Sequence, residues 1–144
     1  MRVAVLGAAG TIAPAIVRDL AESDEVEEIV LLDLRAEEAE RVAREHGVGK
    51  AIARRVDARE NLATALAPVE MLVNSASYRL NLVAMEAALA AACHYLDLGG
   101  LYRVTGEQLA FGSRFEEAGL LAVLGIGSSP GKTNLSLRGS LFSP

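Results

Sequence analysis

Six short runs of strand-forming residues alternate along this chain with alanine-rich segments of helical character. The runs lack the polar/apolar alternation of a half-exposed sheet, which indicates strands covered by helices on both faces. This β-α-β-α order predicts an α/β fold with a doubly wound parallel sheet. We expect strands at Arg2–Leu6, Glu28–Leu32, Ala51–Val56, Met71–Asn74, Tyr95–Leu98 and Leu121–Leu124, and helices near Thr11–Glu22, Ala36–His46, Arg59–Leu66, Leu80–Cys93 and Thr105–Ala118.

The strongest local motif is a glycine turn between the first expected strand and helix, Gly7-Ala8-Ala9-Gly10-Thr11-Ile12-Ala13. Gly7 permits a tight turn, Gly10 allows a pyrophosphate to approach backbone amides, and Ala13 is small enough for helix and strand to pack. Pro14 suits the first turn of a helix. The motif therefore predicts a Rossmann-type domain whose first helix meets the phosphates of a dinucleotide.

A carboxylate at the end of the second expected strand supports this interpretation. Asp33 lies 26 residues after Gly7, near the roughly 20 residues expected for an acid that binds the adenosine ribose. Repulsion between the Asp33 carboxylate and a 2′-phosphate about 4 Å away would cost roughly 4 kcal/mol at an effective dielectric near 20. We therefore expect NAD as the cofactor. NADP is not excluded, because Arg35 is placed to pair with such a phosphate.

Other strand ends supply further candidates. Asp57 is placed either to meet the adenine edge or to cap the following helix, and Ser75-Ala76-Ser77 brings small residues to the nicotinamide half of the crevice. The predicted cofactor-binding residues are Gly7, Ala8, Ala9, Gly10, Thr11, Ile12, Asp33, Leu34, Arg35, Asp57, Ala58, Ser75, Ala76 and Ser77.

Composition excludes several classes of protein. The net charge is −5 and neither sign forms a long block, so we expect no nucleic-acid partner. Cys93, His46 and His94 do not have zinc-ligand spacing, and we expect no metal. No apolar run approaches the roughly 18 residues of a membrane span, and the apolar start is too short for a signal peptide. We expect a cytoplasmic protein.

The 144 residues suit a single domain. We expect a cofactor domain over residues 1–134 and an irregular or truncated tail over 135–144, which shows no clear period. The segment Leu80–Cys93 is apolar almost all round. Either it packs tightly on the sheet, or it lies under a second domain or a dimer partner. We expect a homodimer.

Four segments together resemble the saccharopine dehydrogenase family, especially its lysine dehydrogenase-like members, over about residues 1–135. They are the opening Val5-Leu6-Gly7-Ala8-Ala9-Gly10, the stretches 74–82 (NSASYRLNL) and 94–100 (HYLDLGG), and the stretch 125–134 (GIGSSPGKTN). The resemblance implies an NAD(P)-dependent oxidoreductase that passes hydride between an amino acid's amine-bearing carbon and the nicotinamide.

The resemblance also implies roles for individual residues. Tyr78 and Asp97 match positions near the nicotinamide pocket and are the catalytic candidates; alternatively Tyr78 is a packed side chain and Asp97 caps its strand. Residues 129–134 match the segment that leads into the substrate domain, where free amides would hold a carboxylate. Lys132 departs from the apolar residue usual there, and the large substrate domain does not follow within these 144 residues.

Two functions remain open on the sequence. One is an amino-acid dehydrogenase or its cofactor domain, and the other is a non-catalytic module that senses NAD(H) or another nucleotide. A short-chain dehydrogenase is excluded because that class needs a lysine four residues after a tyrosine. Leu82, Gly99 and Gly106 occupy those positions.

Overall fold

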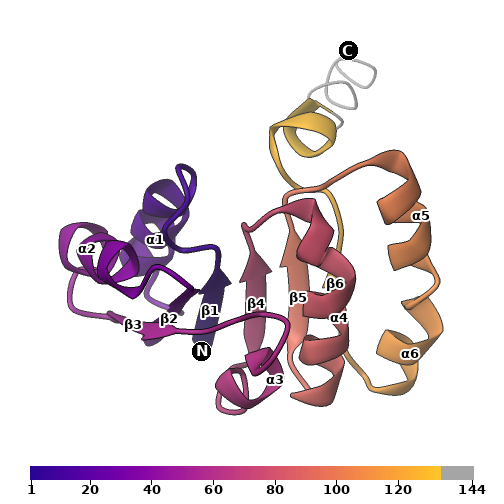
Figure 1. Ribbon diagram of the computed structural model, residues 1–144, viewed down its shortest axis with the longest axis horizontal. Coiled ribbons are helices and arrows are strands. Elements are labelled where there is room, and N and C mark those ends of the chain that lie inside the picture. Colours follow the sequence, from indigo (N-terminus) through magenta and orange to yellow (C-terminus); the bar gives the residue numbers. More distant parts are fainter. Residues whose placement is uncertain (134–144) are drawn as a thin grey trace.

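A computed structural model describes residues 1–133, which form a six-stranded, wholly parallel sheet in the order β3-β2-β1-β4-β5-β6 (Figure 1). This is the strand order of a Rossmann-type domain, and it confirms the fold that the glycine turn predicted. Residues 134–144, which include the expected tail and Asn134, lie outside the described residues. The elements are β1 (Arg2–Leu6), α1 (Ala13–Glu22), β2 (Glu28–Asp33), α2 (Ala36–His46), β3 (Ala51–Arg55), α3 (Leu62–Ala65), β4 (Met71–Asn74), η1 (Tyr78–Leu80), α4 (Asn81–Ala90), β5 (His94–Asp97), α5 (Tyr102–Leu109), α6 (Gly112–Glu117), β6 (Ala122–Val123) and η2 (Ser128–Lys132).

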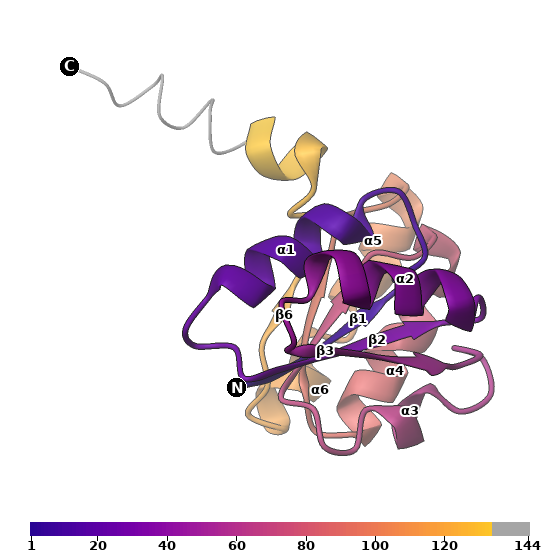
Figure 2. The ribbon, with the colours of Figure 1, turned by 90° about the vertical axis from the view of Figure 1, so that its left-hand side faces the viewer.

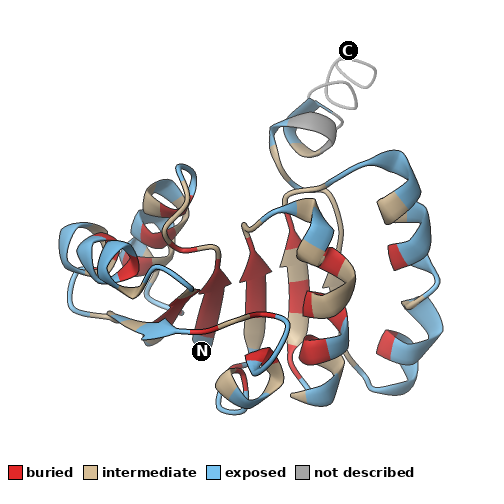
Figure 3. Cartoon of the chain, viewed as in Figure 1, coloured by how far each residue is buried: buried red, intermediate tan, exposed pale blue. Residues whose placement is uncertain are grey.

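The sheet is covered by helices on both faces, as its unbroken apolar strands require (Figure 2). On one face, α1 and α2 pack through Val17 and Val42 against the strand residues that include Ile29. On the other, α3, α4 and α6 cover the sheet, where Leu62 and Phe115 join the core. The buried residues lie along the strands and the inner helix faces (Figure 3).

The chain reverses its direction of travel across the sheet at β1. This strand pairs with β2 on one side and with β4 on the other, so the connections after β1 and after β4 leave the sheet in opposite directions. Such a switch point opens a crevice at the carboxyl ends of the strands. The glycine turn and Ser75–Ser77 face each other across it.

The boundaries differ from those predicted at the two longest helices. The single helix expected at Thr105–Ala118 is two helices, α5 and α6, separated at Ala110 and Phe111. The helix expected to reach Cys93 ends at Ala90, because Ala92 takes a left-handed conformation (φ 53°) and the Cys93 amide donates back to the Ala88 carbonyl. That is a Schellman end made without glycine.

The apolar character of α4 is explained by packing within the chain. Ala84, Met85 and Ala88 are fully buried in the core, and α3 and α5 contact the helix on its flanks. The tight-packing interpretation of this segment accounts for its composition without a partner.

Candidate functional site

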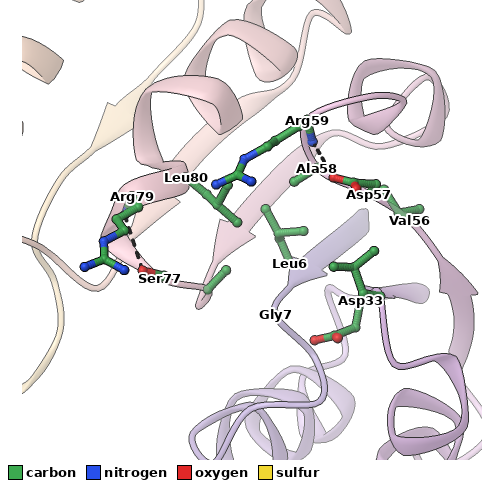
Figure 4. Close-up of a pocket in the computed structure, with 12 residues that line it drawn as sticks. Leu6, Gly7, Asp33, Val56, Asp57, Ala58, Arg59, Ser77, Arg79 and Leu80 are labelled. Carbon is green, nitrogen blue, oxygen red and sulfur yellow. Dashed lines mark hydrogen bonds between the residues drawn. The ribbon is translucent and has the colours of Figure 1, made fainter.

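A cavity of about 330 Å³ lies at the carboxyl ends of the strands, on the β2–β3 side of the switch point (Figure 4). Its floor is apolar and its rim carries both signs of charge. A mostly apolar cavity with a few polar groups is typical of a small-molecule site. The lining residues are Leu6, Gly7, Asp33, Leu34, Val56, Asp57, Ala58, Arg59, Ala76, Ser77, Arg79 and Leu80.

The glycine turn forms one wall of the crevice. Gly7 has a φ of +82°, its amide donates to the Leu32 carbonyl at 2.9 Å, and its carbonyl accepts from the Gly10 amide at 2.9 Å. A Cβ at Gly7 would lie 2.7 Å from the Ala76 Cα and amide nitrogen. Glycine is therefore required here twice, by conformation and by the close approach of the opposite wall.

Two backbone amides at the start of α1 have no acceptor. Among the described residues, the N–H groups of Thr11 and Ile12 make no hydrogen bond. Ala13 is fully buried and Pro14 occupies the first helical turn, as predicted. Unsatisfied amides at a helix start attract anions such as phosphate.

Asp33 ties the glycine turn to the loop after β2. Its Oδ2 accepts from the Ala9 amide at 3.0 Å and its Oδ1 from the Arg35 amide at 2.9 Å. The Arg35 guanidinium in turn donates to the Ala9 carbonyl at 2.8 Å and lies 3.8 Å from Asp33. Asp33 also lines the cavity, and its anchored carboxylate lies beside the glycine turn (Figure 4).

Asp57 does not cap the following helix as one expectation had it, because α3 begins only after its N-cap residue, Asn61. The Asp57 Oδ1 accepts from the Arg59 amide at 2.9 Å, which stabilises the turn before α3, and the side chain lines the cavity beside Ala58. The Arg59 side chain extends across the cavity towards Leu80 (Figure 4). Among the described residues, its guanidinium has no ion-pair partner.

The facing loop is held by its own polar groups. Ser75 donates to the Leu6 carbonyl through both its amide (2.9 Å) and its Oγ (2.8 Å). The Ser77 Oγ accepts from the Arg79 amide at 3.4 Å and caps η1. Ala76 donates its amide to Asn74 Oδ1 at 3.1 Å. Of the three predicted residues, Ala76 and Ser77 line the cavity, and Ser75 fixes the loop to β1.

The two catalytic candidates have very different environments. Tyr78 is half-buried outside the first cavity, beneath the Arg79 guanidinium (5.7 Å to the ring centre), and lines a neighbouring cavity of about 340 Å³ with Leu101 and Arg103. Asp97 is 1% exposed, and its carboxylate accepts four hydrogen bonds. A group so enclosed acts on a ligand only through its neighbours.

A third cavity, of about 400 Å³, adjoins the first at Leu34. Arg35 and Arg55 line it together with Glu37 and Glu38 from the first turn of α2. The lining thus includes two guanidinium groups, which are the side-chain groups that pair with phosphate. This cavity therefore bears on the choice between NAD and NADP.

Several residues of the site were not predicted from the sequence. Arg59, Arg79 and Leu80 line the first cavity. Each follows a strand by a few positions, and that is the only signal that a parallel sheet gives for them. Lys132 is exposed, and its amide donates to the Gly127 carbonyl at 2.9 Å, so it is not one of the free amides expected in the 129–134 loop.

Metal-binding and membrane-spanning features do not occur within residues 1–133. These residues hold no cluster of three or more His, Cys, Asp or Glu side chains that could bind a metal ion. None of their helices has the length and apolar character of a membrane span. Cys93 is fully buried, and burial raises the pKa of its thiol to about 11.

Solved structures of two dehydrogenases share this fold. The chain is similar to a saccharopine dehydrogenase (L-Glu forming) from Saccharomyces cerevisiae, with a TM-score of 0.81 and 20% identity over 97% of this chain and 30% of that one. It is also similar to the shikimate dehydrogenase of Mycobacterium tuberculosis, with a TM-score of 0.63 and 28% identity over 87% of this chain and 46% of that one. The chain thus spans less than half the length of either enzyme.

The family comparison agrees with this structural likeness. Residues 3–123 match the model described as the saccharopine dehydrogenase NADP binding domain. The match includes the glycine turn, Asp33, Asp57 and the loop of Ser75–Ser77. It supports a nicotinamide dinucleotide as the cofactor. The chain belongs to the family of saccharopine dehydrogenase NADP binding domains.

Proposed function

We propose that residues 1–134 form a dinucleotide-binding domain whose crevice holds the pyrophosphate over the turn Gly7–Ile12. The supporting observation is the combination of two acceptor-free amides, on Thr11 and Ile12, with the anchored carboxylate of Asp33 beside them. The amides complement phosphate oxygens, and the carboxylate accepts from ribose hydroxyls. Neither group has to reorganise greatly, because the turn is already closed by the Gly10–Gly7 hydrogen bond.

The adenosine half would occupy the cavity between Asp33 and Arg59. Asp57 uses one carboxylate oxygen for the Arg59 amide, so the other is available to an adenine amino group. Leu34 and Ala58 supply apolar contact. The nicotinamide half would then lie towards Ser77 and Tyr78, on the β4–β5 side of the switch point.

We propose NAD as the preferred cofactor. Asp33 lines the cavity and repels a 2′-phosphate, at a cost of roughly 4 kcal/mol for charges about 4 Å apart at an effective dielectric near 20. Arg35 donates to the Ala9 carbonyl and lies 3.8 Å from Asp33, so a phosphate would have to draw it away. The competing choice is NADP, favoured by Arg35 and Arg55 in the adjoining cavity and by the description of the family.

The activity proposed for the longer protein is hydride transfer between an amino acid's amine-bearing carbon and the nicotinamide. The nicotinamide ring supplies the hydride chemistry when it is bound. Tyr78 is the residue of this chain placed to contact substrate, because it lies half-buried beyond the cofactor cavity, next to Arg79. Asp97 is enclosed and would act as a positioning residue.

A titration tests the binding proposal directly. NADH fluorescence should respond to the wild-type protein, and Asp33→Asn should weaken NADH while weakening NADPH less or improving it. Equal losses for both cofactors would remove Asp33 from the ribose. Asp19→Asn, the same change at an exposed position on α1, is the matched control and should alter neither affinity.

Turnover and assembly need separate measurements. Reduction of NAD with a panel of amino acids, lysine included, would support the enzyme, and binding without turnover of any of them would favour the nucleotide-sensing module. A homodimer is part of the proposal, and sedimentation velocity tests it.

A further inference from the structure

Five buried polar side chains form one continuous network behind the crevice. Each is only 1% exposed, and they come from β4, α4, β5 and α5. Within the described residues, no buried side-chain nitrogen or oxygen lacks a hydrogen-bond partner. Networks satisfied to this degree fix a single arrangement of their groups. The members are Asn74, Asn81, Tyr95, Asp97 and Gln108.

The hydrogen bonds of this network all run in one direction, towards Asp97. Gln108 Nε2 donates to Asp97 Oδ2 at 2.6 Å, which leaves Gln108 Oε1 to accept from Asn81 Nδ2 at 3.3 Å. Asn81 Oδ1 then accepts from Asn74 Nδ2 at 3.0 Å. The Asp97 carboxylate accepts in all four of its hydrogen bonds, so it decides which way each amide in the series must face.

A second, shorter path gives the same direction. The Tyr95 hydroxyl donates to Asp97 Oδ2 at 3.0 Å and accepts from Asn74 Nδ2 at 3.2 Å. Burial raises the pKa of the Tyr95 phenol far above its usual value, so the hydroxyl keeps its proton and remains a donor. Both paths therefore require the Asn74 amide nitrogen to point inwards.

The network ends at the wall of the cofactor crevice. With its nitrogen inward, Asn74 presents Oδ1 to the Ala76 amide at 3.1 Å. A Cβ at Gly7 would lie 2.7 Å from the Ala76 backbone, and Ala76 lines the cavity. At the opposite end, Asp97 Oδ1 accepts from the amides of Gly99 and Gly125, both at 2.8 Å, so the network joins three loops at the carboxyl edge.

We propose that Asp97 is a positioning residue for cofactor binding: through Gln108, Asn81 and Asn74 it sets the direction of the network and so holds the Ala76 peptide in the crevice wall. This inference rests on the proposed function, because it takes the crevice to be the dinucleotide site. Asp97 need not touch the cofactor.

With asparagine in place of Asp97, no arrangement of the amides in the network gives every buried donor an acceptor. The introduced amide can keep its oxygen on the Gly99 and Gly125 amides only by turning its nitrogen towards Gln108 and Tyr95. Gln108, Asn81 and Asn74 then have to flip in turn, and Asn74 presents an N–H group to the Ala76 amide. Without the flips, two donors face each other at position 97. In either case one buried donor loses its acceptor.

A second substitution should repair this defect. In Asp97→Asn/Asn74→Asp, the carboxylate at position 74 accepts from Ala76, from Tyr95 and from a flipped Asn81. Gln108 then donates to Asn81 and accepts from the new amide at position 97. Every group has a partner again, and the direction of the network is reversed. Asn74→Asp alone places a carboxylate at each end of the series. Two acceptors then face each other somewhere along it, and one hydrogen bond of the series is lost.

The experiment is a double-mutant cycle with three measurements. Unfolding in urea gives stability, NADH titration under conditions where all variants are folded gives affinity, and hydrogen exchange of the Ala76 amide gives the local signature. We expect each single variant to lower the folding equilibrium constant by roughly tenfold to a hundredfold, the range for an unsatisfied buried donor. NADH affinity should fall by about tenfold or more, because the Ala76 peptide in the crevice wall is no longer held by its hydrogen bond to Asn74. Asp19→Asn, at an exposed position, should leave all three values unchanged.

The double variant decides the outcome. Recovery of stability, of Ala76 protection and of NADH affinity supports the proposal. A double variant that is as impaired as the two single changes combined would overturn it, and so would a loss of stability in the single variants without any change in NADH affinity. If the wild-type protein itself fails to bind NADH, the proposed function fails, while the stability and exchange data still test the direction of the network.

Discussion

Substituting alanine for Gly7 should separate two costs that usually occur together. A left-handed backbone costs an L-residue about 1–2 kcal/mol, and Gly7 has a φ of +82°. Replacing a glycine reduces the conformational entropy of the unfolded chain and offsets about 0.4–1 kcal/mol of this. At Gly7 the new Cβ would also meet backbone atoms of Ala76 at 2.7 Å, and overpacking of this kind costs about 1–3 kcal/mol more. We expect Gly7→Ala to lower the free energy of unfolding by about 2–4 kcal/mol.

Gly49 provides the matched control. Its φ of +79° is almost the same, but a Cβ there would meet nothing within 4 Å. Gly49→Ala should therefore cost only about 1 kcal/mol. Urea unfolding followed by circular dichroism measures both variants, and NADH titration below the unfolding transition should show a loss for Gly7→Ala alone, because the Ala76 wall has moved.

Equal destabilisation of the two variants would refute the close approach of the two walls. Normal NADH affinity in a clearly destabilised Gly7→Ala protein would refute the assignment of this turn to the cofactor.

Two further predictions concern groups on either side of the sheet. The buried Cys93 thiol keeps its proton up to about pH 11, whereas the thiol of the unfolded chain ionises near 9.0, so its contribution to stability is complete below pH 9 and is lost as the pH rises to 11. Between pH 9 and pH 11, the free energy of unfolding measured in urea should fall by up to about 3 kcal/mol more for wild type than for Cys93→Ala. An equal fall in the two proteins would contradict the raised pKa of the Cys93 thiol. Arg59→Leu should weaken NADH and ADP-ribose but leave reduced nicotinamide mononucleotide unaffected, since only the first two carry the adenosine that Arg59 would cover. A loss for all three, measured by calorimetry, would place Arg59 elsewhere.

The fold was predictable because its signals are local. Unbroken apolar runs indicated covered parallel strands, and the bounds of β1, β4 and α2 agree with those expected. The division between α5 and α6 was not predictable in the same way. Gly106 lies inside α5 while Gly112 begins α6, so glycine position alone does not reveal where the helix stops.

The candidate site shows the same contrast. Asp33 and Asp97 both end a strand, and the sequence around them does not distinguish a carboxylate that faces the crevice from one that lies beneath it. The difference comes from distant residues. Gln108 of α5 and the Gly125 amide enclose Asp97. Asp33 is held by amides of its own neighbourhood, but 12% of its side chain stays exposed and the residue lines the cavity. Only the assembled fold brings these groups together.

The central pairing of β1 with β4 has a consequence for how the crevice forms. Val3 pairs with Ile29, 26 positions on, in β2, but with Met71, 68 positions on, in β4. Closing the longer loop costs about 0.9 kcal/mol more in chain entropy, and contacts distant in sequence slow folding. A nascent chain that has assembled only β1, β2 and β3 already contains the glycine turn. It lacks Ala76, which follows β4 and forms the opposite wall of the crevice. Cofactor present during synthesis would therefore meet the Asp33 side of the crevice first, and the wall of Ser75–Ser77 only after β4 has paired with β1.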